Sequence, residues 1–210
     1  FTTDAVPIGN TTPDFTGGVK NTFSWKGLSL NVFFDFRKGG DIGSATIANG
    51  RYTGLLKETA EGGIRENGIV VDGVIAQMDN NGQPILENEG NPGVKGDEVY
   101  ASTGEKNSIK ADARTYFIFE TFVNAAYVFD GSFIKLREMS LSYTLPQSWL
   151  GKTGIRDATI SIVGRNLAIL HKNIPYLDPD NAISTSNIQG LEGGQAPSAR
   201  SIGMSLNFKF

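Results

Sequence analysis

The chain has 210 residues, no cysteine, a single histidine and a net charge of −3 from 19 basic and 22 acidic side chains. The lack of cysteine excludes disulfide scaffolds and thiolate zinc sites, and a lone His171 argues against a histidine relay or a multi-histidine metal site. No cluster of lysine and arginine is present to neutralise a phosphate backbone, which argues against a nucleic-acid binder. The longest apolar run, Ala125–Phe129, is far shorter than the ~20 residues that a spanning helix needs.

The first predicted elements are two strands, Phe15–Trp25 and Leu28–Arg37, joined by the two-residue turn Lys26-Gly27. A connection this short forces the strands to pair antiparallel. The resulting register matches apolar residues on one face: Trp25 with Leu28, Phe23 with Leu30, Val19 with Phe34 and Gly17 with Phe36. The opposite face is largely polar, with Asn21 and Phe33 as the two exceptions to the pattern.

Three more strands are predicted towards the C-terminus. Their ranges are 132–144, 157–170 and 200–210. The last one is the clearest, because large apolar residues alternate strictly with small polar residues up to Phe210. The sequence therefore predicts five strands.

One of these strands contains a break in its alternation. Ile134 and Leu136 have the wrong parity to share a face with Met139 and the apolar residues that follow it. A one-residue bulge near Arg137 or Glu138 would reconcile the two halves, and so would leaving the upper half outside the apolar belt.

The connections between the strands are strongly unequal in length. Short turns at Lys26-Gly27 and Pro146–Arg156 alternate with long loops at about 38–131 and 171–198, which places all the long loops at one end. A transmembrane barrel has this asymmetry, and a soluble sandwich with decorated loops is the alternative. The polar faces carry mainly small uncharged residues, which favours a water-filled or plugged lumen. We therefore expect an all-β fold, a segment of an antiparallel transmembrane β-barrel.

Five aromatic residues gather at strand ends beside the short turns, where the interfacial girdle of a membrane barrel lies. They are Phe23, Trp25, Tyr143, Phe208 and Phe210. In a sandwich, the same residues would be ordinary core aromatics.

Four blocks of the sequence, taken in chain order, carry a family resemblance. The blocks are Thr12–Phe15 with Arg37–Asp41, Asp130–Glu138 with Leu141–Pro146, Gly164–Leu167, and Gly190–Pro197 leading into Ser201–Phe210. They resemble the SusC/RagA-type, TonB-linked outer-membrane proteins of the Bacteroidetes. Because the chain begins at Phe1 without a signal-peptide pattern, it is expected to be a piece of a longer protein.

The resemblance implies that residues 1–210 form the C-terminal edge of one TonB-dependent receptor barrel of about 22 strands with a plugged lumen. The plug and the strand that closes the barrel would lie outside this sequence. The resemblance also implies a surface lipoprotein similar to SusD that caps the barrel as a lid. TonB would act through an N-terminal region absent here, and Phe210 would be read by the membrane-insertion machinery.

Catalytic, metal and cofactor sites find little support. His171 is expected at the start of a long loop, and no Gly-x-Ser-x-Gly elbow is present. Acidic residues are abundant in the long loop but are interpreted as a solvated face: Glu58, Glu61, Glu66, Glu87, Glu89, Asp97 and Glu98. Asp79–Gly82 lacks the ligand spacing of a calcium loop, and Asp178–Asn181 is expected to be a turn. We expect no catalytic residue, no metal and no cofactor.

The long loop holds the candidate substrate-binding residues. Aromatic rings can stack on sugar rings, and charged groups can bind hydroxyl or peptide groups. The candidates are Arg51, Tyr52, Arg65, Asp97, Tyr100, Tyr116 and Tyr127. The same residues would serve equally to pack the loop or to contact a lid protein.

The leading hypothesis is a multi-pass outer-membrane nutrient importer. It would take up oligosaccharides or peptides using TonB and the inner-membrane proton gradient, with outer-membrane lipid around it. The alternative is a non-transporting surface protein that binds a glycan or host ligand through its loops. An enzyme is not expected.

Overall fold

The structure is a computed structural model that describes residues 6–88, 99–151, 154–181 and 189–210. Two compact units are present. The sheet unit comprises Gly9–Ser44 and Phe129–Phe210, and the loop unit comprises Ala45–Val128 together with the N-terminal segment ending at Ile8. In the described residues, no helix is long and apolar enough to cross a membrane.

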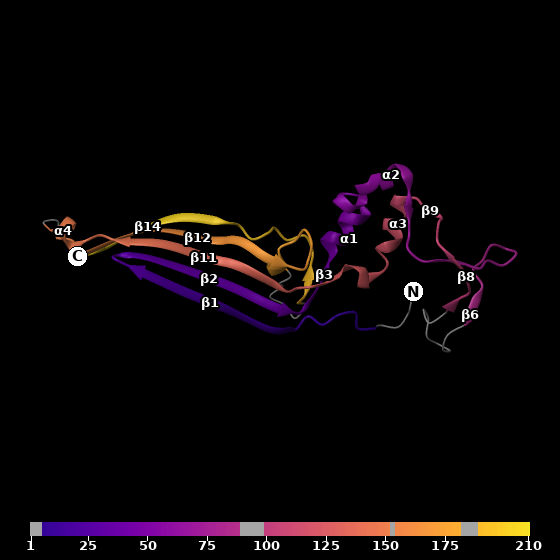
Figure 1. The fold of residues 1–210 in the computed structure, drawn as a ribbon, viewed down its shortest axis with the longest axis horizontal. Helices are drawn as coiled ribbons and strands as arrows, with labels where there is room; N and C mark the ends of the chain where they lie inside the picture. The colour runs from indigo at the N-terminus through magenta and orange to yellow at the C-terminus, as the bar shows by residue number, and fades with distance from the viewer. Residues whose placement is uncertain (1–5, 89–98, 152–153, 182–188) are drawn as a thin grey trace. The chain divides into compact units, whose positions relative to one another are not determined.

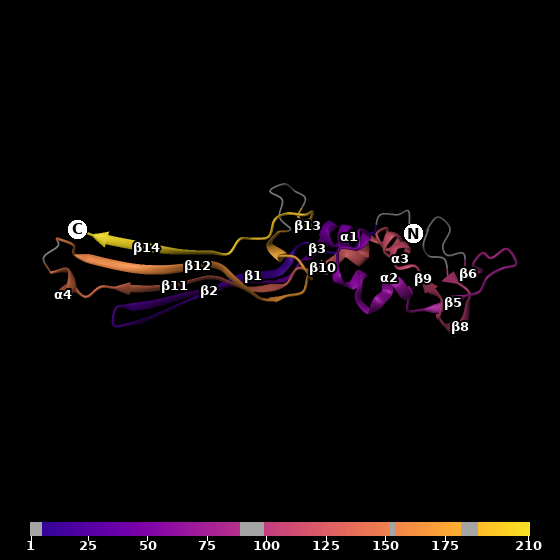
Figure 2. The same ribbon diagram turned by 90° about the horizontal axis from the view of Figure 1, so that it is seen from above.

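A five-stranded antiparallel sheet dominates the sheet unit, with the strand order β1-β2-β11-β12-β14 (Figure 1). Its strands are β1 (Pro13–Trp25), β2 (Leu28–Gly39), β11 (Phe133–Thr144), β12 (Asp157–Lys172) and β14 (Ser201–Lys209). Seen from above, these strands form a single curved layer (Figure 2). The short helix α4 (Gln147–Leu150) lies in the turn between β11 and β12.

The hairpin register expected from the sequence is confirmed. Trp25 lies opposite Leu28 and Phe23 opposite Leu30. Lys26 and Gly27 both have positive φ, 46° and 85°. A two-residue turn with this backbone matches the right-handed twist of the two strands that it joins. The exception at Phe33 also has a physical reason. Its ring lies over Gly18, where a Cβ would stand only 2.6 Å from a ring carbon.

The expected bulge in β11 is also confirmed. Leu136 lies opposite Phe34 and Glu138 opposite Phe33, so Arg137 has no partner in the ladder to β2. The extra residue restores the parity of the strand, and therefore Leu136 shares a face with the apolar residues further down.

The two faces of the sheet differ sharply in chemistry. Cross-strand rows of apolar residues cover one face, including Trp25-Leu28-Tyr143-Ile160-Leu206 and Phe23-Leu30-Leu141-Ile162-Met204. The other face carries polar pairs that bond between strands. Examples are Thr22 with Asn31 at 2.7 Å, Asn31 with Ser140 at 3.3 Å and Arg165 with Glu138 at 3.0 Å.

Short elements complete the sheet unit. β3 (Asp41–Ser44), β10 (Val128–Asp130) and β13 (Leu191–Glu192) form a three-stranded sheet, and η4 (Pro179–Asn181) is a 3-10 turn. Ile42 and Ile174 are fully buried in this part of the unit.

The loop unit consists of short helices and strands, which lie in the long segment between β3 and β10. Its helices are α1 (Ala45–Tyr52), α2 (Ile64–Asn67) and α3 (Ala113–Glu120), with 3-10 turns η1 (Lys57–Thr59), η2 (Glu61–Gly63) and η3 (Asn124–Tyr127). Small two-stranded sheets pair β4 (Ile69–Val70) with β9 (Lys110–Ala111), β5 (Val74–Ala76) with β8 (Ser102–Lys106), and β6 (Leu86–Asn88) with β7 (Val99–Tyr100).

Helix α3 begins where its sequence provides a cap. The Asp112 carboxylate accepts hydrogen bonds from the backbone N–H of Thr115 at 2.8 Å and from its hydroxyl at 2.9 Å. Such a cap satisfies backbone donors that the first turn leaves without a partner. Ala113 and Phe117, four residues apart, are the buried positions of the helix.

Candidate functional site

The large apolar side chains of the five-stranded sheet are exposed. Trp25 is 70% exposed, Phe23 61%, Met204 71% and Leu206 57%. Water-soluble proteins rarely present an apolar area that runs across five strands, whereas a lipid-facing surface must be apolar. Of the girdle candidates, Trp25 and Tyr143 share one cross-strand row at the turn end.

Of the other girdle candidates, Phe23 lies in β1 opposite Leu30, and two lie in or after β14. Phe208 lies opposite Ala158 near the turn end of β12, and Phe210 follows the strand; both are exposed. Their role as a membrane girdle, and that of Phe210 as an insertion signal, stays a prediction.

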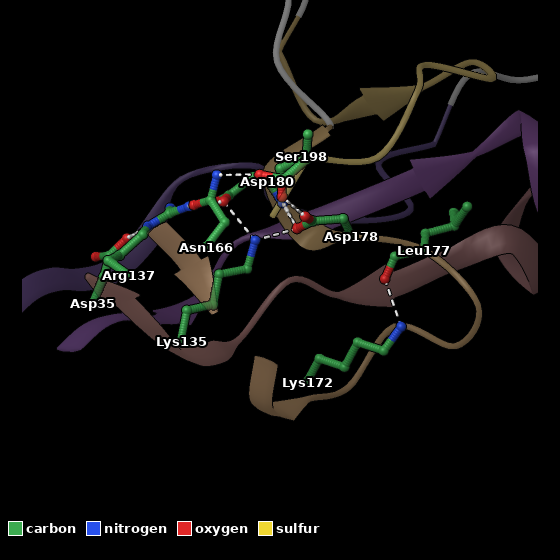
Figure 3. Close-up of polar contacts among 10 residues, drawn as sticks. Asp35, Lys135, Arg137, Asn166, Lys172, Leu177, Asp178, Asp180 and Ser198 are labelled. Atoms are coloured by element: carbon green, nitrogen blue, oxygen red, sulfur yellow. Dashed lines mark hydrogen bonds and ion pairs between the residues drawn. The ribbon is translucent and has the colours of Figure 1, made fainter. Parts of the chain in front are cut away.

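A cluster of charged groups lies on the polar face of the sheet, towards the ends of the strands that lead into the long loops (Figure 3). We call it the Asp178 cluster: Asp35, Lys135, Arg137, Asp178 and Asp180. Lys135 Nζ contacts carboxylate oxygens of Asp178 and Asp180, the latter at 2.5 Å. Arg137 contacts Asp180 at 2.5 Å through Nη1 and Asp35 at 2.7 Å through Nε. The side chains of Lys135 and Asp178 are each only 5% exposed.

The bulge in β11 is what gathers the cations. The extra residue turns Arg137 towards the polar face, where Lys135 lies opposite Asp35 of β2. Asp180 lies in the turn η4 and Asp178 directly precedes it, so the expected turn at Asp178–Asn181 is present. It also ties the loop after β12 back onto the sheet, a contact that the sequence did not suggest.

Hydrogen bonds hold the Asp178 carboxylate in its charged form. Burial acts to raise the pKa of Asp178, but donation from Lys135 and from the Ser198 hydroxyl outweighs burial, so its pKa lies below the ordinary value. The Asp178 carboxylate therefore stays ionised at neutral pH. An ion pair buried this far is intolerant of losing one partner, because the other charge is left without compensation.

A pocket of about 300 Å³ opens beside the cluster and includes Lys135, Asp178 and Ser198 in its lining. Two further lining residues, Asn166 and Tyr176, have φ of 50° and 59°, and both are non-glycine residues in the left-handed region. The Asn166 amide donates to the Ala199 carbonyl at 3.1 Å, which supports this backbone. Strained backbone of this kind concentrates where a site is held in a particular geometry.

The loop unit has its own charged group, the Arg51 cluster, formed by Arg51, Glu58, Glu120 and Tyr127. Arg51 pairs with Glu58 and Glu120, both at 3.2 Å, and its guanidinium lies 5.6 Å from the centre of the Tyr127 ring. The Tyr127 hydroxyl contacts Glu120 at 3.3 Å. Burial and the adjacent Glu120 carboxylate raise the pKa of Tyr127 to about 12. These contacts join α1, α3 and η3.

Three of the predicted binding residues line one pocket of the loop unit. This arginine pocket has a volume of about 220 Å³, and Arg51, Tyr52 and Arg65 are all in its lining. Arg114 of α3 lines it as well, with Phe117 beneath. None of its nine lining residues is acidic.

The other binding candidates are dispersed. Tyr100 is 53% exposed in β7, and Tyr116 packs edge-on against Phe117 with ring centres 5.2 Å apart. Asp97 lies outside the described residues. Sequence reasoning misses Arg114 and Glu120, because no local pattern shows that α3 packs against α1, and Arg51 and Glu120 are 69 residues apart.

Two smaller expectations can be compared with the structure. Asp79 accepts hydrogen bonds from the backbone N–H groups of Asn81 and Gln83, both at 2.8 Å, so Asp79–Gly82 is a turn. The expected position of His171 was wrong: it lies in β12 opposite Ile134, because the strand continues to Lys172. Within the described residues, no group of three or more histidine or acidic side chains is placed to hold a metal ion.

Comparison with known proteins finds two similar receptors. No protein-family model matches the sequence. The TonB-dependent receptor P3 of Formosa agariphila is 30% identical over 216 residues, and the TonB-dependent receptor P26 of the same organism is 28% identical over 219 residues. Each alignment covers 100% of this chain, and the chain spans 18% of each relative.

Solved structures support the same fold. The RagAB peptide importer in its open-open state covers 95% of this chain with a TM-score of 0.54 and 21% identity, and this chain covers 17% of that one. The closed-closed state gives the same TM-score and identity. In sequence the chain is thus similar to a segment of TonB-dependent receptors, and its fold is that of the matching part of the RagAB peptide importer.

Proposed function

We propose that this chain forms part of the barrel wall and the external loops of a TonB-dependent importer in the bacterial outer membrane. The complete barrel would contain about 22 strands and be closed by strands outside this sequence. It would import oligosaccharides or peptides, with a SusD-like surface lipoprotein as its lid. TonB would engage a region that this chain does not contain.

The exposed apolar face of the sheet carries this proposal. Its cross-strand rows run from Trp25 in β1 to Leu206 in β14 and are interrupted by no charged residue. The opposite face combines small hydroxyl and amide side chains with the Asp178 cluster, as suits a wet or plugged lumen.

The edge strands fit the same proposal. Within the described residues, β1 and β14 are each paired on one side only in the five-stranded sheet. In lipid, the unpaired backbone groups of such an edge would each cost several kcal/mol, about the cost of burying a polar group without a partner. Both strands therefore need neighbours from the rest of a longer chain.

The loop unit would face the outside and the ligand. Tyr52 and Arg65 are the candidates that we propose for ligand contact, because both line the arginine pocket. Tyr100 is exposed enough for a ligand or lid contact. Arg51 and Tyr127 are engaged with Glu120 and would hold the unit in shape.

Spin labels on β14 of the full-length protein test the membrane assignment. Single cysteines at Met204 and Leu206 probe one face, and cysteines at Gly203 and Ser205 probe the other. In lipid vesicles, labels at 204 and 206 should collide with oxygen, while labels at 203 and 205 should collide with a water-soluble nickel chelate. Equal access of the chelate to all four positions would contradict a membrane-spanning strand.

Uptake tests the import itself. Cells that express the full-length protein are given fluorescent neutral oligosaccharides and fluorescent peptides, with and without a functional TonB. Accumulation that depends on TonB supports import. Surface binding without accumulation would favour the alternative, a non-transporting surface protein.

A further inference from the structure

The arginine pocket has an excess of positive charge. Arg51 is compensated by Glu58 and Glu120, which are not part of the lining. In the described part of the chain, the ion pairs of the loop unit involve Arg51, Lys57 and Lys106, and they include neither Arg65 nor Arg114. Among the described residues, neither Arg65 nor Arg114 forms an ion pair within 4 Å. Hydrogen bonds from Thr115 lower the pKa of the nearby Asp112 carboxyl group, and the charge of Arg114 helps to lower it.

The position of Arg65 is fixed by neutral groups. Its Nε donates to the Thr59 carbonyl at 2.9 Å, and Nη2 donates to the Thr59 hydroxyl at 2.9 Å and to the Gly54 carbonyl. Neutral acceptors orient a guanidinium without cancelling its charge. Arg65 is thus pre-organised, which reduces the entropy lost when an anion binds.

The rim of the pocket provides a surface for a sugar ring. Tyr52 is 53% exposed and belongs to the lining together with the hydroxyl-bearing Thr53 and Thr59. An exposed aromatic ring next to hydroxyl groups is a common arrangement for stacking against a pyranose and binding its hydroxyls. A volume of about 220 Å³ is of the order of one sugar residue.

We infer that the arginine pocket binds an acidic sugar residue of an oligosaccharide, with its carboxylate or sulfate ester held by Arg65 and Arg114 and its ring placed against Tyr52. This assignment deepens the proposed import function and rests on it. It narrows the substrate from oligosaccharides or peptides in general to acidic oligosaccharides.

Calorimetry on the full-length protein in detergent micelles tests the inference. The probes are trigalacturonic acid, the neutral galactotriose, a short acidic peptide and inorganic sulfate. Trigalacturonic acid should bind, and its affinity should fall as salt screens the charges. Binding of galactotriose or of the peptide with equal affinity would overturn the acidic-sugar assignment. If sulfate binds as tightly as the trisaccharide, the pocket is a site for free anions, and the acidic-sugar assignment is overturned as well.

Variants of exposed residues locate the binding. Arg114 is exposed, and its contact with Asp112 includes a backbone hydrogen bond that the substitution keeps, so Arg114→Gln should fold normally. Loss of one charge-assisted hydrogen bond should weaken trigalacturonic acid roughly tenfold to hundredfold. Lys110→Gln removes the same charge from an exposed residue outside the lining and should change the affinity less than about twofold. Equal effects of the two variants would overturn the assignment.

A second variant separates the sugar from its charge. Tyr52→Ala should weaken trigalacturonic acid severalfold without weakening competition by sulfate. Unchanged trisaccharide binding in Tyr52→Ala would refute the stacking role. If cells take up neutral sugars or peptides in a TonB-dependent way but no acidic probe binds, the proposed import function stands. Only the assignment of an acidic substrate would then be overturned.

Discussion

The five-stranded sheet and the loop unit place apolar and charged side chains in opposite ways. On the sheet, Leu206 and Trp25 are exposed, while Lys135 and Asp178 are buried. In the loop unit, Ile47 and Phe117 are buried and the ionic contacts of Arg51 remain partly exposed. The loop unit follows the rule for a protein folded in water. The sheet follows the inverse rule, which is the distribution expected of the proposed wall with lipid on one side and a polar interior on the other.

Removing a buried cation should cause the largest change. Lys135→Met leaves Asp178 buried without its main partner, and we expect a destabilisation of about 3–5 kcal/mol. Urea unfolding of the full-length protein in lipid vesicles measures the change. Lys20→Met on the same face of β1, where Lys20 is exposed, is the matched control and should stay within about 0.5 kcal/mol of the wild type. Equal free energies of unfolding for Lys135→Met and Lys20→Met would show that the Asp178 cluster does not stabilise the protein.

A charge on the apolar face should be the next largest perturbation. Ile202→Arg, two apolar cross-strand rows further from the turn end than the girdle candidates Trp25 and Tyr143, is expected to destabilise the inserted protein by about 2–4 kcal/mol. Ser205→Arg places the same group on the polar face of the same strand and should change stability by less than about 1 kcal/mol. Vesicle unfolding compares the pair. A larger loss from Ser205→Arg would reverse the assignment of the faces.

The Arg51 cluster should respond more weakly than its counterpart on the sheet. Arg51→Gln leaves Glu58 and Glu120 without their cation, but partial exposure screens the loss, and we expect about 1–2 kcal/mol. Hydrogen exchange of α1 and α3 reports opening of this unit. The exposed pair Lys57–Glu61 serves as control, and Lys57→Gln should leave the exchange unchanged. If Arg51→Gln lost more stability than Lys135→Met, the Arg51 cluster would contribute more than the Asp178 cluster, contrary to the expected difference between the two units.

Acid should affect the sheet cluster gradually and only at low pH. The folded pKa of Asp178 lies below its ordinary value, so its stabilising contribution is complete above about pH 4 and is lost as pH falls through the folded pKa. We expect a spin label at Tyr176 to become more mobile over this acid range. In Asp178→Asn the label should already be mobile at pH 7, with little further change on acidification. A transition near pH 7 in the wild type would point to a different titrating group.

The sheet was more predictable than the loop unit for a physical reason. A strand shows its buried or lipid-facing side through alternation, and a two-residue turn determines which residues face each other, so the pairing of Trp25 with Leu28 followed from the sequence. The parity of Ile134 against Met139 revealed the bulge in the same way. Elements of two to five residues in the loop unit are too short to show a period.

The sites were predicted only in part. Arginine and tyrosine in the long loop suggested ligand contact, and the structure brings Arg51, Tyr52 and Arg65 to one pocket. No local pattern connects Lys135 with Asp178, because they are 43 residues apart and meet only after the chain has reversed direction. Pairs of this kind depend on how a loop returns to the sheet, which composition and spacing do not encode.

The bulge in β11 has a consequence for changes in chain length. Elsewhere in the strand, deleting one residue would transfer every side chain on one side of the deletion to the opposite face of the sheet. At Arg137, the deletion removes the residue that has no partner in β2 and leaves Leu136 opposite Phe34 and Glu138 opposite Phe33. A relative whose strand is one residue shorter at this position should therefore retain both faces, lack the arginine, and also lack the carboxylates that Arg137 holds here, Asp35 and Asp180.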